Sequence, residues 1–331
     1  MSLLQEAQTR GHDWISTLVQ HVSDLVVVVD IHGTVIYANA AAARLYGVPV
    51  EEAIGTNVFQ YIHPDDRERV FRSYTELLGR PGATVVDTVR VMSRSSGESR
   101  ILEIVRTNLL HLPEIAGIVV NGRDVTERNN YINRLQVTLD AITLAIANTI
   151  DIKDPYTAGH QREVAYLAEA IARELAMSDD EVKGIEVAST LHDIGKIALP
   201  AEVLNRPGKL SSPEFEMIKR HSQTGHDIVA DVPFPWPVAE MILQHHERLD
   251  GSGYPNGLSG GEILPGSRII AVADVISAMS GHRPYRPARG IKAALVEVES
   301  ERGRLYDPDA VDASLRLFRD RSFSLEGSLF S

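Results

Sequence analysis

The chain has 331 residues, which is enough for two domains with separate hydrophobic cores. It contains no cysteine, which excludes disulfides, thiol nucleophiles and thiolate ligands, so any metal must be held by His, Asp or Glu. The formal net charge of -12 argues against binding nucleic acid through a broad basic face. A small anionic substrate remains compatible with this charge, because distant charges are screened and a few local cations can dominate a pocket.

The apolar segments do not indicate a membrane protein. The longest runs, such as DLVVVVDI, have the length of a strand and are too short to cross a bilayer. The N-terminus MSLLQEAQTRGHDW lacks the basic and apolar stretches of a signal peptide. We therefore expect a cytoplasmic protein with no membrane partner and no DNA partner.

The first third of the chain predicts a mixed domain of strands and helices. Turn signals and β-branched runs predict strands in LVVVVD, IHGTVIYAN, TVVDTVRVMS, SRILEIVRTNLL and AGIVVNGRDV. A short helix is expected in AAAARLYG, ended by Gly47. This order resembles a PAS domain, to which VVDIHGTVIYANAAAARLYG, YIHPDDRERV and GRDVTER are similar. The resemblance implies an α+β PAS sensor domain over residues 13–127.

The ligand of this PAS domain is left unassigned by the sequence. Without cysteine, a flavin–cysteinyl photoadduct is excluded. His63, in the stretch YIHPDD, is expected to be structural rather than a haem ligand. A PAS core that holds no ligand and serves only for dimerisation is the alternative.

Residues 128–150 predict a connecting helix with an apolar seam. The apolar side chains step by three and four residues, as in a coiled coil, through Ile132, Leu135, Leu139, Ile142 and Ile146. One interpretation is a single amphipathic helix that packs on its own domain. The other is a parallel coiled coil, which the position between two domains favours. It predicts a homodimer held through the PAS domain and this linker.

From residue 151 onward the pattern is helical. A capping box from Ser178 to Glu181 opens a helix that is expected to continue through STLHDI and to be broken by Gly195. Pro213 marks the start of another helix. The chain is therefore predicted to be multidomain, with an all-α domain over residues 151–331.

Seven of the twelve histidines lie in this helical half. A single helical histidine is usually structural, and the dipeptide His192-Asp193 decides nothing alone. However, Asp274 lies within the apolar run AVADVIS, where an unpaired carboxylate would be costly and a bound cation would remove that cost. His245 and His246 are adjacent, about 100° apart around a helix, so that both can border one cleft.

Five segments occur in the order of an HD-GYP domain and resemble that family over about 170 residues. They are DPYTAGHQREVA, LHDIGK, IKRHSQTG, QHHERLDGSGYP and VADVISAMSGHRPYR. The family belongs to the HD superfamily of metal-dependent phosphohydrolases, and this chain resembles its cyclic di-GMP phosphodiesterases. The resemblance implies an HD-type helical domain that hydrolyses a phosphoric diester.

The resemblance also implies a set of metal ligands and two divalent ions per chain. One ion would be held by His160, His192, Asp193 and Asp274. A second would be held by His221, His245 and His246, with Asp193 bridging the two. Imidazole and carboxylate ligands suit Fe or Mn, with Zn as the alternative.

Further residues are implied to act on the substrate. Lys196 would donate to a phosphate oxygen or to the departing oxygen during catalysis, or would instead interact with the end of its helix. Arg283 and Arg286 would bind the phosphate that is not cleaved, or would form a solvated pair. The loop Gly253-Tyr254-Pro255 would line the guanine site or contact a signalling protein. His226 and His282 are expected to be surface residues.

Two positions depart from the family pattern. The family usually carries an acid three residues after the Asp274 position, where this chain has Ser277. Some members also carry a glutamate four residues before the first histidine, able to bind a third metal, where this chain has Tyr156. The first departure bears on the level of activity, and the second favours two metals.

The function implied is that of a PAS-regulated phosphodiesterase that opens cyclic di-GMP to linear pGpG, with GMP as a further product. A second hypothesis keeps the metal site and changes the substrate to another cyclic dinucleotide or nucleotide. A third is an HD-GYP domain of weak activity that serves as a signalling interaction module.

Overall fold

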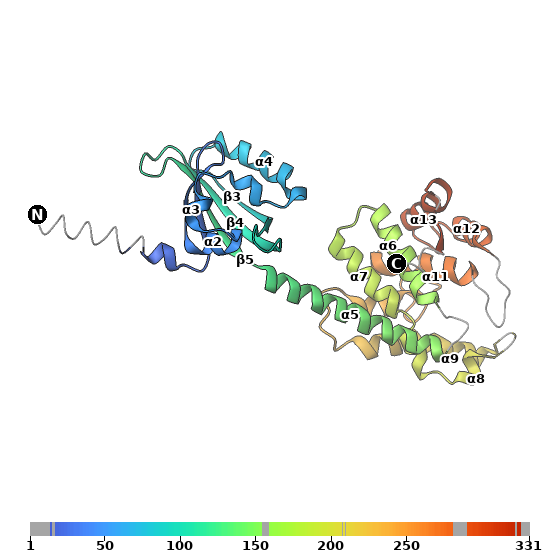
Figure 1. Cartoon of the computed structure of the whole chain (residues 1–331). Helices are drawn as coiled ribbons and strands as arrows, with labels where there is room; N and C mark the ends of the chain where they lie inside the picture. The colour runs from blue at the N-terminus through green and yellow to red at the C-terminus, as the bar shows by residue number, and fades with distance from the viewer. Residues whose placement is uncertain are drawn as a thin grey trace, which may run out of the picture. The chain divides into compact units, whose positions relative to one another are not determined.

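The computed structural model describes residue 14 and residues 17–153, 159–206, 208, 210–280, 290–321 and 323–325. The chain divides into two compact units, Met1–Gln136 and Val137–Ser331. Figure 1 shows the α/β elements in the first unit and helices in the second. Among the described helices, none combines the length and the apolar character that crossing a membrane requires.

The first unit contains a five-stranded antiparallel sheet in the order β2-β1-β5-β4-β3. Its strands are β1 (Leu25–Val29), β2 (Val35–Ala38), β3 (Thr84–Met92), β4 (Ser99–Leu109) and β5 (Gly117–Asp124). The helices that accompany it are α2 (Ala40–Tyr46), α3 (Val50–Ala53), the 3-10 helix η1 (Val58–Tyr61) and α4 (Pro64–Leu78). The predicted PAS fold is confirmed, each predicted strand segment containing one of the five strands.

Local chemistry explains how the first elements of this unit form. Alternate residues of β1 are buried, so one face of the strand packs into the core. Asn39 caps α2 by accepting from the backbone of Ala42, and the helix ends at Gly47, which adopts φ 67°. His63 lies at the N-cap of α4, where its Nδ1 accepts a hydrogen bond from the Asp65 backbone.

Aromatic side chains fill part of the PAS core. The rings of Tyr46 and Tyr61 stack with their centroids 4.1 Å apart. Phe59 meets Tyr74 edge to face at 5.3 Å. Such pairs bury a large apolar area in a preferred geometry, which stabilises the packing of α2, η1 and α4 on one another.

Helix α5 (Thr126–Lys153) contains the predicted apolar seam in one continuous helix. Leu135, Leu139 and Ile142 are 46%, 61% and 52% exposed in the single chain. Nearer the end of the helix, Ala147 and Ile150 are buried. The helix is therefore confirmed, and its pairing as a coiled coil stays a prediction.

The second unit is built from helices, as predicted. They are α6 (His160–Glu174), α7 (Asp179–Leu191), the 3-10 helix η3 (Ile194–Ala198), α8 (Ala201–Leu204), α9 (Ser212–Val229), α10 (Val238–Gln244), the 3-10 helix η4 (Gly260–Glu262), α11 (Pro265–Ser280), α12 (Ile291–Ser300) and α13 (Pro308–Asp320). The capping box of Ser178 and Glu181 opens α7, and a proline lies in the first turn of α9, as expected.

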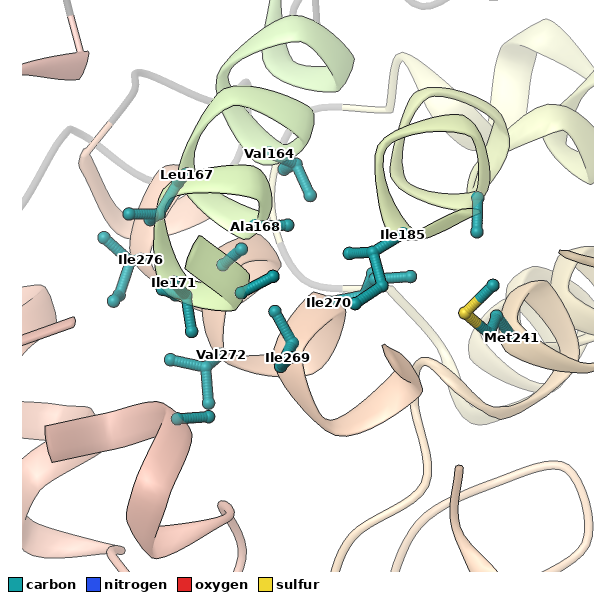
Figure 2. Close-up of a cluster of buried hydrophobic side chains, with 14 of the residues drawn as sticks. Val164, Leu167, Ala168, Ile171, Ile185, Met241, Ile269, Ile270, Val272 and Ile276 are labelled. Atoms are coloured by element: carbon teal, nitrogen blue, oxygen red, sulfur yellow. The ribbon is translucent and has the colours of Figure 1, made fainter. Parts of the chain in front are cut away.

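Helix α11 lies at the centre of the helical core. Figure 2 shows Ile269, Val272 and Ile276 of α11 among side chains of α6 that include Leu167 and Ile171. Ile185 of α7 and Met241 of α10 extend the same cluster. A helix that is apolar nearly all round is stable only when neighbouring helices cover it. Asp274 is therefore carried into the interior by the packing of α11 itself.

Candidate metal centre

The seven residues predicted as metal ligands lie together in the helical unit. His160 begins α6, His192 caps the end of α7, and Asp193 precedes η3. The other four come from α9, from the end of α10 and from α11, and they are His221, His245, His246 and Asp274. Five segments distant in sequence thus supply one cluster.

Three groups of ligand atoms within this cluster are close enough to hold an ion, each with its atoms within 4.8 Å of one another. The groups are His221-His245-His246, His160-His192-Asp274 and His192-Asp193-His245. Because the third group shares one residue with each of the others, the cluster is continuous.

Asp193 faces both ends of this cluster. Its Oδ2 lies 3.5 Å from Nε2 of His192, and its Oδ1 lies 3.4 Å from Nε2 of His221. Asp274 has a similar position, with Oδ1 3.0 Å from Nε2 of His160 and Oδ2 3.9 Å from Nδ1 of His246. A carboxylate with one oxygen toward each group has the geometry of a bridging ligand.

The backbone fixes the orientation of three of the imidazoles. Nδ1 of His192, His221 and His245 each lies within 2.6–2.7 Å of the carbonyl oxygen three residues earlier in its own helix. A carbonyl only accepts, so each Nδ1 carries the hydrogen and each Nε2 presents a lone pair to the cluster. Such an outer hydrogen bond is typical of histidines that bind metals.

One buried atom indicates that a cation fits here. Nε2 of His192 is buried and has no hydrogen-bond partner among the described residues. A buried polar atom without a partner is costly, and a metal ion bound at this nitrogen would remove the cost. The donor set of imidazoles and carboxylates is also one that divalent transition metals accept.

The electrostatics of the cluster favour the protonation states that metal binding needs. Burial tends to raise the pKa of Asp193, but Lys196 and the surrounding histidines hold that pKa well below its usual value. Burial lowers the pKa of His245 to about 3 and moves the pKa of His246 well below its usual value. The carboxylate is therefore ionised and these imidazoles are neutral at neutral pH.

Lys196 lies inside the site, on the 3-10 helix η3. Its side chain is buried, and Nζ is 2.5 Å from Oδ2 of Asp193. The sequence predicted one helix continuing to Gly195, whereas α7 ends at Leu191 and η3 follows. The break redirects the chain, so that Asp193 and Lys196 both point into the cluster.

Gly195 allows η3 to pack directly against α9. A Cβ atom at this position would lie 1.9 Å from the carbonyl oxygen of His221 and 2.5 Å from the backbone nitrogen of Gly225. Both neighbours are main-chain atoms, which cannot turn away as a flexible side chain can. The close contact sets the distance between Asp193 and His221.

We expect Gly195→Ala to destabilise the chain by about 3 kcal/mol or more, because the added methyl group must push two helices apart. Chemical denaturation followed by circular dichroism measures the change. Gly261→Ala is the matched control, since a Cβ there meets no atom within 4 Å. Equal stability of the two variants would contradict the packing argument.

The loop Gly253-Tyr254-Pro255 borders the second group of ligands. The ring of Tyr254 lies 4.8 Å from the ring of His246, and the Nζ of Lys219 lies 5.6 Å from the Tyr254 ring centroid. Burial raises the pKa of Tyr254, so its hydroxyl stays protonated. A Cβ at Gly253 would lie 2.4 Å from the Cα of Glu247, which shows how closely the loop folds back.

Two glutamates near the site were not predicted. The buried carboxylate of Glu247 accepts hydrogen bonds from the backbones of Asn256 at 2.7 Å and Leu258 at 3.0 Å, which holds the loop in place. Glu163 accepts a hydrogen bond from Ser277 at 2.6 Å. Burial raises the pKa of Glu163 and the hydrogen bond from Ser277 opposes the rise.

Some predicted residues lie elsewhere. His226 is partly exposed and contacts Asp227 at 3.0 Å, apart from the three ligand groups, as expected of a surface residue. Arg283 and Arg286, proposed from the sequence as phosphate ligands, lie outside the described residues, as do His282 and Tyr156.

Known proteins resemble both units. A PAS fold model matches residues 19–130, and an HD domain model matches residues 145–310. A cyclic di-GMP phosphodiesterase response regulator, RpfG of Xanthomonas campestris, is 43% identical over 173 residues, which are 52% of this chain and 46% of that protein. A cyclic di-GMP phosphodiesterase of Thermotoga maritima is 42% identical over 180 residues, covering 54% of this chain and 49% of its own length.

A third relative carries a different substrate in its name. The 3'3'-cGAMP-specific phosphodiesterase 3 of Vibrio cholerae is 39% identical over 194 residues, which are 57% of this chain and 42% of that protein. The chain spans about half the length of the curated relatives it matches. Since the HD domain model matches just over half of the chain, the chain belongs to the HD domain family and carries a PAS fold ahead of its HD domain.

Proposed function

We propose that this chain is a metal-dependent phosphodiesterase that opens cyclic di-GMP to linear pGpG, with GMP as a further product, under the control of its PAS domain. The observation that carries the proposal is the largely buried cluster of five histidines and two aspartates, in which Asp193 faces both groups of ligands. A domain used only to bind another protein has no need of such a cluster.

Two divalent ions per chain, Fe or Mn, are proposed for this cluster. His160, His192, Asp193 and Asp274 would hold one, and His221, His245, His246 and Asp193 would hold the other. When bound, a pair of such ions supplies a nucleophilic water at neutral pH and a clamp for the phosphate oxygens. The ionised Asp193 and the neutral imidazoles are already in the forms that bind a metal.

The chain's own residues position the substrate. Lys196 is the buried cation of the site, and we assign it the role of donating from Nζ to an oxygen of the scissile phosphate or to the departing oxygen. Tyr254 lies beside His246 and offers a ring against which a guanine base can stack. Arg283 and Arg286 are proposed to bind the other phosphate as two-pronged donors.

Cyclic di-GMP is proposed ahead of cyclic GMP-AMP because two relatives named for cyclic di-GMP are 43% and 42% identical to this chain, whereas two relatives named for 3'3'-cGAMP are each 39% identical. The second substrate is therefore the alternative. The remaining alternative is a chain of weak activity that acts through a protein partner bound at the Tyr254 loop. It stays open because this chain has Ser277 where the family pattern has an acid.

The test is to incubate the purified, Mn- or Fe-loaded chain with each dinucleotide and to separate the products by chromatography. We expect pGpG from cyclic di-GMP at a higher kcat/KM than turnover of 3'3'-cGAMP. Preferred cleavage of 3'3'-cGAMP would replace the substrate and keep the enzyme class. Full metal loading without hydrolysis of either would favour the interaction module.

The exposed seam of α5 supports a homodimer as part of the proposal. Leu135 and Leu139 are about half exposed in the single chain, and a parallel partner helix would bury both. Each leucine side chain that is fully buried contributes about 1.5–3 kcal/mol. Four such side chains would be covered in a pair of chains.

We therefore expect Leu135→Glu combined with Leu139→Glu to convert a dimer into a monomer and to change the rate of hydrolysis. Light scattering coupled to size-exclusion chromatography measures the first effect, and product formation measures the second. Asn130→Glu combined with Asn133→Glu adds the same charge on the face of the helix away from the seam and serves as the control. A wild-type chain that is fully active as a monomer would refute the dimer.

A further inference from the structure

A chain of hydrogen bonds links His160 to a carboxylate that belongs to none of the described ligand groups. Nδ1 of His160 lies 2.8 Å from Oγ of Ser277, and the Ser277 hydroxyl donates to Oε2 of Glu163 at 2.6 Å. On its other side, Nε2 of His160 lies 3.0 Å from Oδ1 of Asp274. The imidazole is thus flanked by two carboxylates, one in direct contact and one reached through a hydroxyl.

The Ser277 hydroxyl has one hydrogen, which sets the direction of this chain. An ionised Glu163 carries no hydrogen, so the hydroxyl hydrogen goes to Glu163. Toward His160 the Ser277 oxygen can then only accept, so Nδ1 carries a hydrogen. In a neutral imidazole the remaining nitrogen, Nε2, then keeps its lone pair, and Nε2 is the atom that faces Asp274 in the ligand group.

His160 is oriented by Ser277 rather than by its own helix, because it lies at the start of that helix. The other three oriented imidazoles use the carbonyl three residues earlier in the same helix. His160 is the first residue of α6, so the carbonyl three residues earlier lies outside that helix. The acceptor for Nδ1 comes instead from α11, and Glu163 supplies negative charge from the next turn of α6.

We propose that Glu163 is a positioning residue for the metal ligand His160 and that it acts through Ser277 as a relay. The proposal rests on the metal centre proposed above. A carboxylate behind a metal-binding imidazole fixes the ring and raises its basicity, and loss of such a partner typically lowers metal affinity about 10–100-fold. Glu163 thereby supplies the negative charge that an acidic side chain at position 277 would supply beside His160.

The first experiment measures manganese affinity of the full-length chain by competition with a chelating indicator. Glu163→Gln keeps an oxygen that accepts from Ser277 but removes the charge, and we expect the affinity for the ion held by the His160 group to fall about 10-fold. Ser277→Ala breaks the link entirely and should lose at least as much. Glu169→Gln is the matched control, since Glu169 lies on the same helix and pairs with Arg173 at 3.0 Å.

The second experiment is a rescue, which a purely structural role of Glu163 would not produce. Ser277→Asp in the Glu163→Gln background places a carboxylate directly against Nδ1 of His160, so manganese affinity should return toward the wild-type value. Ser277→Asp alone sets two carboxylates side by side and should bind manganese less tightly than the double variant. Thermal unfolding in the presence of a chelator verifies that each variant folds.

The outcomes separate this inference from the proposed function. A wild-type chain that takes up no manganese overturns the metal centre, and the relay with it. Wild-type uptake with equal affinity in Glu163→Gln, or a double variant that shows no recovery, overturns the relay and leaves the metal centre standing. Should Glu163→Gln fail to fold, Glu163→Asp serves instead, because its shorter side chain draws the carboxylate away from Ser277 and should lower manganese affinity in the same direction.

Discussion

Replacing Asp193 by alanine is expected to abolish hydrolysis and to remove both metal ions from the chain. The carboxylate has one oxygen 3.5 Å from Nε2 of His192 and the other 3.4 Å from Nε2 of His221, so the substitution takes a ligand from each group at once. It also leaves the cation of Lys196, buried beside it, without this carboxylate. Breaking a buried ion pair by removing one member costs about 3–5 kcal/mol, so the metal-free variant should also unfold more readily.

Metal analysis of protein purified without chelators, together with product formation from cyclic di-GMP, measures both effects. Asp227→Ala is the matched control, because Asp227 also follows a histidine but lies on the surface of α9 beside His226. We expect that control to keep its metal and its activity. Turnover near the wild-type rate in Asp193→Ala would end the two-metal proposal.

Local signals predicted much of the fold, because they act between residues close in sequence. The alternating burial of β1, the αL glycine that ends α2 and the capping box of Ser178 and Glu181 each lie within a few residues. The end of α7 was harder to predict. The 3-10 helix that follows it packs through Gly195 against the backbone of α9, and no local pattern encodes this contact.

The residues of the metal centre also divide into those that the sequence predicted and those that only folding reveals. The seven candidate ligands were identified because several histidines and two aspartates recur in segments that resemble one family. Glu163 and Glu247 were missed because their significance lies in contacts formed by folding. Glu163 meets Ser277 across 114 positions of the chain, and Glu247 holds the backbone of a loop that begins several residues later. Nothing in the spacing of either glutamate indicates these partners.

Replacing Lys196, which lies beside Asp193, is expected to have the second large effect on hydrolysis. Lys196→Met keeps a long side chain but removes the cation next to Asp193. In the metal-loaded chain the bound ions would compensate the charge of Asp193, so metal content should stay at the wild-type level. Loss of one donor to a phosphate oxygen typically lowers kcat about 100–1000-fold. We therefore expect this loss with little change in the number of ions bound.

The metal-free form of Lys196→Met should behave differently. There, Asp193 is buried and loses the nearest cation, which lies 2.5 Å away in the wild-type chain. We expect a lower unfolding temperature for this variant in chelator and recovery when Mn²⁺ is added, because the ion replaces the missing positive charge. Lys183→Met is the control, since Lys183 belongs to none of the ligand groups and pairs with Glu186 at 2.9 Å and with Asp140 of α5 at 3.0 Å. If Lys196→Met kept full turnover, Lys196 would be only the counter-ion of Asp193; if it lost its metal, the lysine would act through the ligands rather than on the phosphate.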